Sequence, residues 1–463
     1  MKKIMALLSF LIITTIAIAQ DITGTWNGQL EVQKGRTLLF IFNITKGDNT
    51  FSTEIAIPSQ GVKGVLTSST TLEGEKLVID ASNVGFKYTG TWSASTQKIE
   101  GVFQEGVNSV PLTLTREELK EAQLTRPQEP VKPYPYQEEN ILFENKKAGV
   151  KLAGTLTLPA GPNKKAPAVI LISGSGPQDR DESFATHKPF LILADYLTRR
   201  GIAVLRYDDR GFGESTGNFA ASTTADFASD VKSAVDYLMS RQDIDHKNIG
   251  LIGHSEGAII APMVANQCKE VAFIVMLAGT GTSGRQVSLQ QAVDFRNFPV
   301  ADEQQYEDYI KKAIDIAAAD KEVAEVIKEL TEFYNNSALL ASLLPSTVDK
   351  EEFIQNLVAT RTTPWVRYFY NYNPADEIEK LKVPALALYG SKDTQVPPKY
   401  HLEPVHKALK ASKSKNQQVI LMDGLNHLFQ HCETGSVSEY PQIEQTFAPE
   451  ALDVIGDWVI GVM

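Results

Sequence analysis

Apolar and polar residues alternate in short runs between about residues 20 and 125. Phe51–Ile57 and Lys76–Ala81 are two such runs, and Glu73-Gly74 is one of the turn-forming pairs between them. Alternation of this kind, interrupted by turn residues, is typical of antiparallel strands. About eight short strands fit the region, which predicts a small all-β barrel or sandwich over 20–125.

The pattern changes at about residue 140. Before it, residues 126–139 are polar and rich in proline, which favours a stiff, extended linker. After it, apolar runs alternate with stretches of helical spacing, which predicts a mainly parallel sheet flanked by helices, an α/β domain over 140–463. The expected strands are Glu139–Asn145, Val150–Leu158, Ala168–Ser173, Ile202–Tyr207, Ile249–Ile252, Val271–Leu277, Ala385–Tyr389 and Gln418–Met422.

One stretch interrupts this alternation, at about residues 284–373. It has no convincing strand, but Glu303–Ala319 and Lys321–Tyr334 have amphipathic helical spacing. We therefore expect a helical cap inserted between the sixth and seventh strands. The aromatic cluster around Trp365 and Phe369 is too dense to be buried by one helix face, so these two side chains are expected to line a substrate pocket. Packing within the cap is the alternative.

The composition is that of a globular protein, with 43% hydrophobic and 22% charged residues. A net charge of −11 argues against nucleic acid or an anionic membrane surface as a partner. No basic cluster and no metal-ligand spacing of Cys and His occurs, so neither a metal nor a cofactor is expected. Only two cysteines are present, Cys268 and Cys432, and a disulfide between them is disfavoured because they are expected at opposite ends of the domain.

The N-terminus has the features of a signal peptide. Met1-Lys2-Lys3 is a short basic region, and an apolar run follows it up to the small residues Ala17-Ile18-Ala19. We expect residues 1–19 to be removed after Ala19 and the protein to be secreted or periplasmic. A membrane anchor is the weaker alternative, since the apolar run is short. No later segment is apolar enough to span a bilayer in the mature chain.

The most informative stretch is the run from Asn248 to Ala265. An apolar strand leads into Gly253-His254-Ser255-Glu256-Gly257, and helical spacing follows. Strand, G-x-S-x-G and helix in this order predict a nucleophile elbow, with Ser255 exposed on a sharp turn beside a helix N-terminus. A glycine-flanked turn with an incidental serine is the alternative.

A serine nucleophile needs a histidine base and a carboxylate that orients it. His427 is the best of the seven histidines, because it follows the last apolar strand; His431 remains an alternative. His254 lies inside the elbow and cannot reach the hydroxyl of its own neighbour as a base. Asp393 follows the strand Ala385–Tyr389 on the same edge, with Asp376 and Asp423 as less favoured alternatives.

The reaction also needs donors for an oxyanion. The backbone N–H of Glu256, directly after the serine, is expected to be one of them. The second is expected to be the N–H of Ser175, in the glycine-rich loop Gly174–Pro177 after the strand Ala168–Ser173. Asp179-Arg180-Asp181, further along, is interpreted as a local ion-pair cluster.

Taken together, these motifs resemble a known superfamily. The segments that carry the resemblance are Ile172–Arg180, Arg206–Ser215, Gly253–Gly257, Gly390–Pro397 and Asn426-His427. Residues 140–463 resemble the α/β-hydrolase superfamily, closest to secreted bacterial serine carboxylesterases related to prolyl-oligopeptidase-like hydrolases. The resemblance implies the α/β-hydrolase fold. This chain has Ser173 where many such relatives have a histidine before the oxyanion glycine.

The expected function is that of an exported serine hydrolase that cleaves short acyl or aryl esters through an acyl-enzyme. Ser255, His427 and Asp393 would form the triad, and a small-molecule ester would be the partner. A peptidase of the prolyl-oligopeptidase-like type with the same triad is the first alternative. A non-enzymatic binding protein is the second, and the sequence leaves the oligomeric state open.

Overall fold

The structure is a computed structural model that describes most of the chain. The described residues are 21–33, 36–47, 50–58, 62–82, 85–105, 108–119, 126–161, 165–296, 298–344 and 349–463. The expected signal peptide, 1–19, lies outside them. The chain forms two compact units, residues 1–124 and 125–463, which are described separately.

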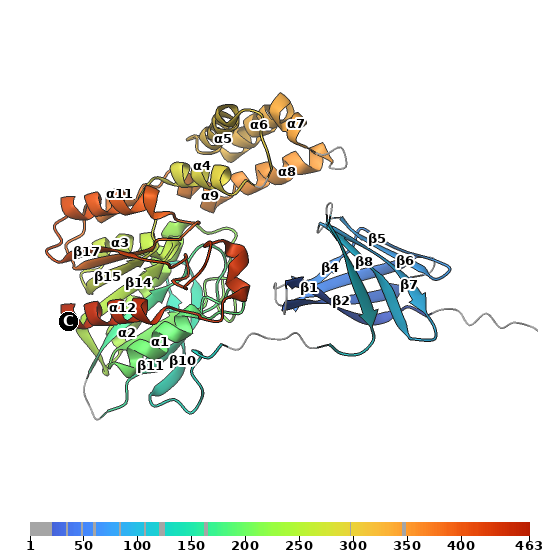
Figure 1. Cartoon of the computed structure of the whole chain (residues 1–463). Coiled ribbons are helices and arrows are strands. Elements are labelled where there is room, and N and C mark those ends of the chain that lie inside the picture. The colour runs from blue at the N-terminus through green and yellow to red at the C-terminus, as the bar shows by residue number, and fades with distance from the viewer. Residues whose placement is uncertain are drawn as a thin grey trace, which may run out of the picture. The chain divides into compact units, whose positions relative to one another are not determined.

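The first unit is an antiparallel β-barrel (Figure 1). Its strands follow the order β2-β1-β9-β8-β7-β6-β5-β3, and a β2–β3 pairing closes the ring, with β4 added along one edge of β3. The bounds are β1 (Gly24–Gln33), β2 (Arg36–Lys46), β3 (Phe51–Ile57), β4 (Val62–Leu66), β5 (Ser69–Glu73), β6 (Lys76–Ala81), β7 (Phe86–Ser93), β8 (Lys98–Glu105) and β9 (Asn108–Thr115).

Aromatic side chains fill the barrel, because alternate strand residues point inward. Trp26, Phe42 and Tyr88 are fully buried, and Trp26 packs edge-on against Trp92 with ring centroids 5.4 Å apart. The Arg116 guanidinium lies over the Trp26 ring at 4.4 Å. The barrel is therefore a small module with a packed interior, as the alternating pattern predicts.

The second unit is built on a mixed sheet of eight strands in the order β10-β11-β13-β12-β14-β15-β16-β17. The pairs β10–β11 and β11–β13 are antiparallel, and the others are parallel. The bounds are β10 (Gln137–Asn145), β11 (Val150–Leu158), β12 (Ala166–Ile172), β13 (Ala203–Tyr207), β14 (Ile244–His254), β15 (Val271–Leu277), β16 (Ala385–Gly390) and β17 (Gln417–Met422).

Helices cover both faces of this sheet, which explains why the central strands are continuous apolar runs. Helices α1 (Pro189–Arg199) and α12 (Pro449–Val462) pack on one face. The other face carries α2 (Thr224–Ser240), α3 (Glu256–Gln267), α10 (Pro374–Ile378) and α11 (Pro398–Ala411). A 3₁₀ turn, Val437–Gln442, precedes the last helix.

The cap between β15 and β16 consists of helices with a core of their own. Figure 1 shows them as a lobe beside the sheet and α11. The bounds are α4 (Gly284–Asp294), α5 (Glu303–Ala317), α6 (Val323–Asn335), α7 (Ala338–Leu343), α8 (Lys350–Arg361) and α9 (Pro364–Tyr370). Ile310, Val326, Leu330 and Tyr334 are among the residues of that core. The apolar faces of α5 and α6 thus pack within the cap itself.

Residues 126–139, for which composition favours a linker, lie against the second unit. The Arg126 guanidinium donates to the carbonyl oxygens of Ile443 and Ala185. The Gln128 side chain donates to Phe447 O at 2.6 Å and accepts from Thr446 N–H at 2.6 Å. Residues from 137 onward belong to β10. These polar contacts hold the segment in place, so that it is part of the domain it leads into.

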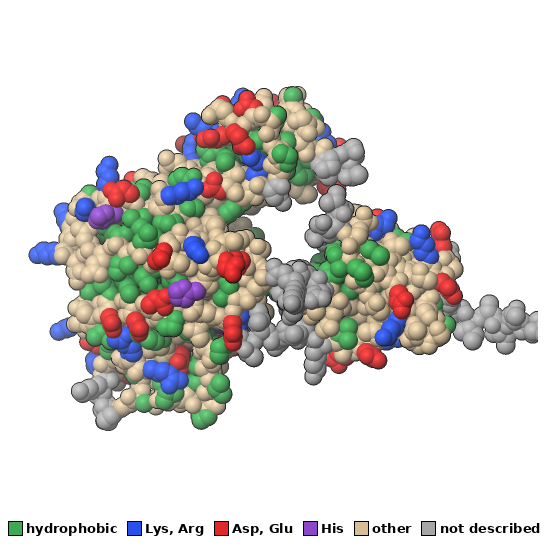
Figure 2. Space-filling view, in the orientation of Figure 1, with side chains coloured by type: hydrophobic (Ala, Val, Ile, Leu, Met, Phe, Trp, Pro, Cys, Tyr) green, Lys and Arg blue, Asp and Glu red, His purple; other side chains and the backbone are tan. Residues whose placement is uncertain are grey.

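On the face of the protein drawn in Figure 2, basic side chains lie scattered among acidic ones and form no continuous basic area. Within the described residues, none of the helices has the length and apolar character needed to span a bilayer.

Candidate active site

Ser255 lies on a strained turn between β14 and α3. Its backbone has φ 53° and ψ −111°, in a region that residues other than glycine rarely adopt. Two glycines make the turn possible. A Cβ on Gly253 would lie 2.0 Å from Gly257 O, and one on Gly257 would lie 2.1 Å from Ile172 O. The close packing of strand and helix therefore requires glycine on both sides of the serine.

Asp393 and His427 meet at the same edge of the sheet. His427 Nδ1 lies 2.7 Å from Asp393 Oδ2, and both residues are buried, with 5% and 3% of their surface exposed. Asp393 Oδ1 accepts from the N–H groups of Gln395 and Val396, each at 2.8 Å. These bonds fix the carboxylate, which in turn orients the imidazole ring.

The loop that carries His427 is held by the side chain of its neighbour Asn426. The Asn426 Oδ1 accepts from the N–H groups of Leu428 and Gln430, each at 3.0 Å. In the part of the chain that the structure describes, no hydrogen bond joins the Ser255 hydroxyl to the His427 ring. In unliganded hydrolases this contact is often longer than in the substrate complex.

The alternatives to these residues lie elsewhere. His431 forms an exposed ion pair with Glu450 at 2.6 Å. Asp423 accepts from the Ser391 hydroxyl at 3.0 Å, and Asp376 accepts from Asn373 at 2.9 Å. Neither carboxylate contacts His427 in these hydrogen bonds.

The loop after β12 lies beside the serine. A Cβ on Gly174 would be 3.2 Å from Ser255 Cβ. The Gly174 N–H donates to Glu182 Oε1 at 2.7 Å, so it is already engaged. Among the described residues, the Ser175 N–H has no acceptor. The Glu256 N–H belongs to the first turn of α3, where helical geometry provides no intrahelical acceptor.

The side chain of Glu256, whose position next to the serine predicts only a backbone role, is a buried carboxylate. Its Oε1 accepts from Thr224 Oγ1 and from Trp365 Nε1, each at 2.7 Å. Burial raises the pKa of Glu256, while the bonds from Trp365, Thr224 and Ser175 oppose the rise. Helices α2, α3 and the cap helix α9 therefore meet at one carboxylate.

Trp365 and Phe369 stack on each other on α9, with centroids 5.2 Å apart and planes 6° from parallel. The bond from Trp365 to Glu256 brings this pair close to the elbow. A cavity of about 680 Å³ beside α9 is lined by Tyr368, Tyr372, Thr223 and Arg367 among others, and Trp365 and Phe369 are not among its lining residues. A second cavity, of about 800 Å³, lies beside Asp393.

The loop after β13 forms hydrogen bonds to the loop after β12. The sequence assigns no chemistry to the loop after β13. Asp209 accepts from the Ser173 hydroxyl at 2.7 Å and from the Gln178 N–H at 2.9 Å. Burial raises the pKa of Asp209 to about 8, with further contributions from the carboxylates of Glu256 and Glu182. Ser173 thus serves as a donor to Asp209.

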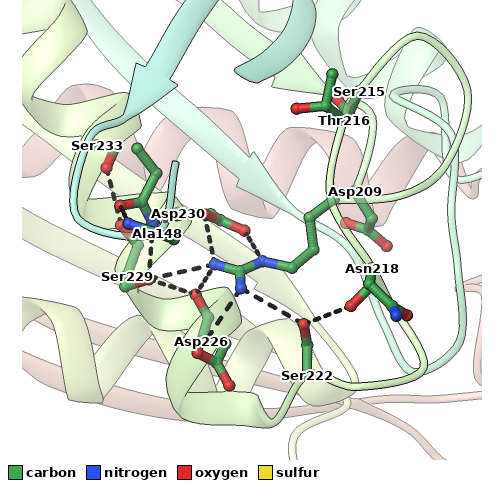
Figure 3. Close-up of polar contacts among 12 residues, drawn as sticks. Ala148, Asp209, Ser215, Thr216, Asn218, Ser222, Asp226, Ser229, Asp230 and Ser233 are labelled. Carbon is green, nitrogen blue, oxygen red and sulfur yellow. Dashed lines mark hydrogen bonds and ion pairs between the residues drawn. The ribbon is translucent and has the colours of Figure 1, made fainter. Parts of the chain in front are cut away.

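Ion pairs hold both of these loops. Arg180 pairs with Asp208 at 2.6 Å, and Arg206 pairs with Asp181 at 2.7 Å. The expected cluster at 179–181 therefore forms its ion pairs with β13 and the loop after it. Further along, the Arg210 guanidinium bonds both carboxylate oxygens of the buried Asp230. Figure 3 shows the polar side chains around it, with Asp209 pointing away from them.

The second unit has the α/β-hydrolase fold, which confirms the predicted fold class. The strand order, the elbow after β14 and the buried acid and histidine after β16 and β17 place it in that class. The chain belongs to the X-Pro dipeptidyl-peptidase (S15) family, whose model matches residues 148–429. It is therefore a hydrolase of the esterase or peptidase type.

The chain is also similar to individual proteins. Esterase EstD of Thermotoga maritima is 27% identical over 324 residues, which cover 69% of this chain and 68% of the esterase. The uncharacterized protein YfhR of Salmonella typhimurium is 32% identical over 127 residues, 27% of this chain and 39% of that protein. The structure of the Pyrococcus furiosus esterase Pf2001 aligns with a TM-score of 0.42 at 17% identity, over 70% of this chain and 93% of that one.

Four residues near the serine were not expected to matter through their side chains: Glu182, His254, Asp209 and Glu256. Their partners lie far away in the chain, so no local pattern indicates them. Among the described residues, no group of three or more His, Cys, Asp or Glu side chains is arranged to hold a metal ion.

Proposed function

We propose that the protein is an exported serine hydrolase that cleaves short acyl or aryl carboxylic esters through an acyl-enzyme. The observation that carries the proposal is the buried 2.7 Å contact between Asp393 and His427 at the sheet edge where the strained turn presents Ser255. A serine after β14, a carboxylate after β16 and an imidazole after β17, at one edge of the sheet, are the residue types that a serine-hydrolase triad uses.

In the proposed reaction, Ser255 Oγ attacks the ester carbonyl carbon while His427 Nε2 takes its proton. Asp393 holds the Nδ1–H and stabilises the imidazolium. The N–H groups of Glu256 and Ser175 donate to the oxyanion of the tetrahedral intermediate. The intermediate collapses with loss of the alcohol, which receives the proton from His427. Water then attacks the acyl-enzyme by the same route and releases the acid.

An ester substrate is supported by the surroundings of the elbow. The aromatic pair of Trp365 and Phe369 lies beside Glu256, next to the serine, and suits a small apolar group. The chain is also similar to a protein named an esterase. The first unit is a single small barrel. Its described strands form no repeated propeller blades that would restrict which peptides reach a peptidase site.

The family match favours a second candidate, a peptidase that removes X-Pro dipeptides with the same three residues. The triad cannot separate the two reactions. A comparison of kcat/KM for p-nitrophenyl esters and for X-Pro anilides does so. We expect ester hydrolysis that a serine-reactive phosphonate blocks, with little anilide cleavage. An anilide kcat/KM equal to or above that for the esters would replace the esterase proposal by the peptidase.

Export is part of the proposal and rests on the basic and apolar residues of 1–19. The mature chain is expected to begin at Gln20. Mass spectrometry of the protein from its native cells tests this, and an uncleaved Met1 would contradict it.

A further inference from the structure

A second carboxylate–imidazole pair lies directly beside the proposed triad. His254, the residue before the serine, and Glu182, in the loop after β12, are buried, with 6% and 4% of their surface exposed. His254 Nδ1 lies 2.9 Å from Glu182 Oε1. His254 Nε2 lies 2.9 Å from the backbone carbonyl oxygen of His427. Both ring nitrogens of His254 therefore have an oxygen as partner.

These partners define the charge of the ring. A carbonyl oxygen can only accept a hydrogen bond, so Nε2 carries a hydrogen. Nδ1 faces a carboxylate oxygen that also accepts the Gly174 N–H, so it carries a hydrogen as well. Burial disfavours the charged ring, but the Glu182 carboxylate and the His427 carbonyl outweigh it and raise the pKa of His254. This set of partners fits an imidazolium beside a carboxylate.

The contacts of this ion pair join the two sides of the site. Glu182 Oε1 holds Gly174, which precedes the proposed oxyanion donor Ser175. His254 holds the backbone of His427, the proposed base. A continuous series of hydrogen bonds thus runs from the loop after β12, through the elbow, to the loop after β17.

We propose that His254 and Glu182 are positioning residues, which set the distance between the oxyanion loop and the base loop on either side of Ser255. The inference rests on the proposed serine hydrolase function. His254 can serve both loops only while both of its nitrogens carry hydrogen. A neutral ring would leave either Glu182 or the His427 carbonyl without a donor, and the loop on that side would lose its anchor.

Other charged groups face the pair from each neighbouring element. His427 is nearest, with ring centroids 4.7 Å apart, and Asp393 stands behind it and favours the charged form of His254. Asp209 and Glu256 face the pair from the loop after β13 and from α3, and Glu182 and Glu256 both raise the pKa of Asp209. The carboxylates of Glu182 and Asp393 favour the positive charge on His254, while a proton gained by the His427 ring during turnover opposes it.

Glu182→Gln tests the proposal, since the amide oxygen can still accept from Gly174 and from His254. Without the carboxylate charge, the pKa of His254 falls and the ring loses its proton at a lower pH than in the parent. We expect the alkaline limb of the kcat profile to move to lower pH. Above that limb, kcat should fall by about tenfold to a hundredfold, as for a misplaced catalytic group, with KM little changed.

His187→Asn is the matched control. His187 is also buried, with Nδ1 at 3.0 Å from Thr446 Oγ1 and Nε2 at 2.8 Å from Tyr440 O. Burial lowers the pKa of His187 to about 4, so its ring is neutral. The control should change thermal stability while leaving the pH profile of kcat in place. A Glu182→Gln enzyme that folds and keeps the parent profile would overturn the proposal.

A measurement on the unaltered enzyme tests the proposal even if Glu182→Gln fails to fold. In ¹⁵N-histidine NMR, both nitrogens of His254 should be protonated at about pH 7. One bare ring nitrogen there would overturn the proposal. The same sample separates the two hypotheses: absence of phosphonate-sensitive ester hydrolysis in the parent defeats the proposed function, whereas the NMR result addresses the ion pair alone.

Discussion

The site contains two buried carboxylate–imidazole pairs that differ in the second nitrogen of the ring. In the Asp393–His427 pair, Nδ1 of the ring lies 2.7 Å from the carboxylate, and Nε2 is left for proton transfer. In Glu182–His254, both nitrogens are bound, at 2.9 Å each. The first arrangement suits a base that must gain and lose a proton. The second suits a fixed cation.

Two further buried histidines extend the comparison. Burial lowers the pKa values of His187 and His401 to about 4. No carboxylate bonds either ring among the described residues. The two buried rings without a carboxylate partner therefore have a lowered pKa, whereas His254, which has Glu182 beside it, has a raised one.

The largest effect is expected from Ser255→Ala, which removes the nucleophile and leaves both pairs in place. Activity should fall by at least about 10⁴-fold, the scale of losses in serine hydrolases. Alanine fits the turn, so the melting temperature should stay close to that of the parent. Ester turnover near the parent rate in this variant would remove Ser255 from its role.

Asp393→Asn breaks the first pair while keeping its shape. The amide cannot stabilise an imidazolium as a carboxylate does, and kcat should fall by about 10⁴-fold, more than for Glu182→Gln. Asp423→Asn is the control, because Asp423 is exposed and its carboxylate accepts from the Ser391 hydroxyl, away from His427. Equal losses of kcat in Asp393→Asn and Glu182→Gln would contradict the assignment of His427 as the base and His254 as a fixed cation.

Much of this fold could be predicted because apolar patterns are local. Phe51–Ile57, Val150–Leu158 and Val271–Leu277 have the bounds that the sequence predicts. Strand β5 (Ser69–Glu73) was missed because its sequence, STTLE, is polar and only Thr70 is buried in it. A strand whose single apolar residue, Leu72, is only partly buried against the core leaves little hydrophobic signal.

The side-chain contacts around the serine could not be predicted in the same way. Glu182 and His254 are 72 residues apart in the chain, and Glu256 and Trp365 are 109 apart. Such pairs depend on how the loops and the cap pack, so Glu182 and Glu256 look like ordinary surface charges in the sequence. The positions of Ser255, Asp393 and His427 follow from strand ends, which the apolar runs locate.

A smaller effect is expected from the aromatic pair of the cap. Trp365→Ala and Phe369→Ala should each change the ratio of kcat/KM between short and longer acyl esters by about tenfold, since a methylene in an apolar pocket is worth about that much. A series of aryl esters of increasing acyl length measures the ratio. Phe333→Ala, within the cap core, is the control. If both α9 variants keep the parent ranking, the pair serves only packing.

The smallest effect concerns stability and comes from Asp209. Its pKa is raised from 3.8 to about 8 in the folded protein, so the folded state holds the proton more tightly than the unfolded one. The stability that this group contributes is present at low pH and is lost as the pH rises from about 4 to about 8, by at most about 1.4 kcal/mol per pH unit.

Asp209→Asn mimics the protonated form, because the amide can still bond the Ser173 hydroxyl and the Gln178 N–H. The melting temperature of the variant relative to the parent should therefore rise with pH, by about 2 °C for each kcal/mol. Asp236→Asn, on the exposed face of α2, should show no such trend. A constant difference between variant and parent from pH 5 to pH 8 would mean that Asp209 is ionised in the folded protein. The acidic groups beside His254 would then carry more negative charge than the raised pKa implies, which would strengthen the hold on its proton.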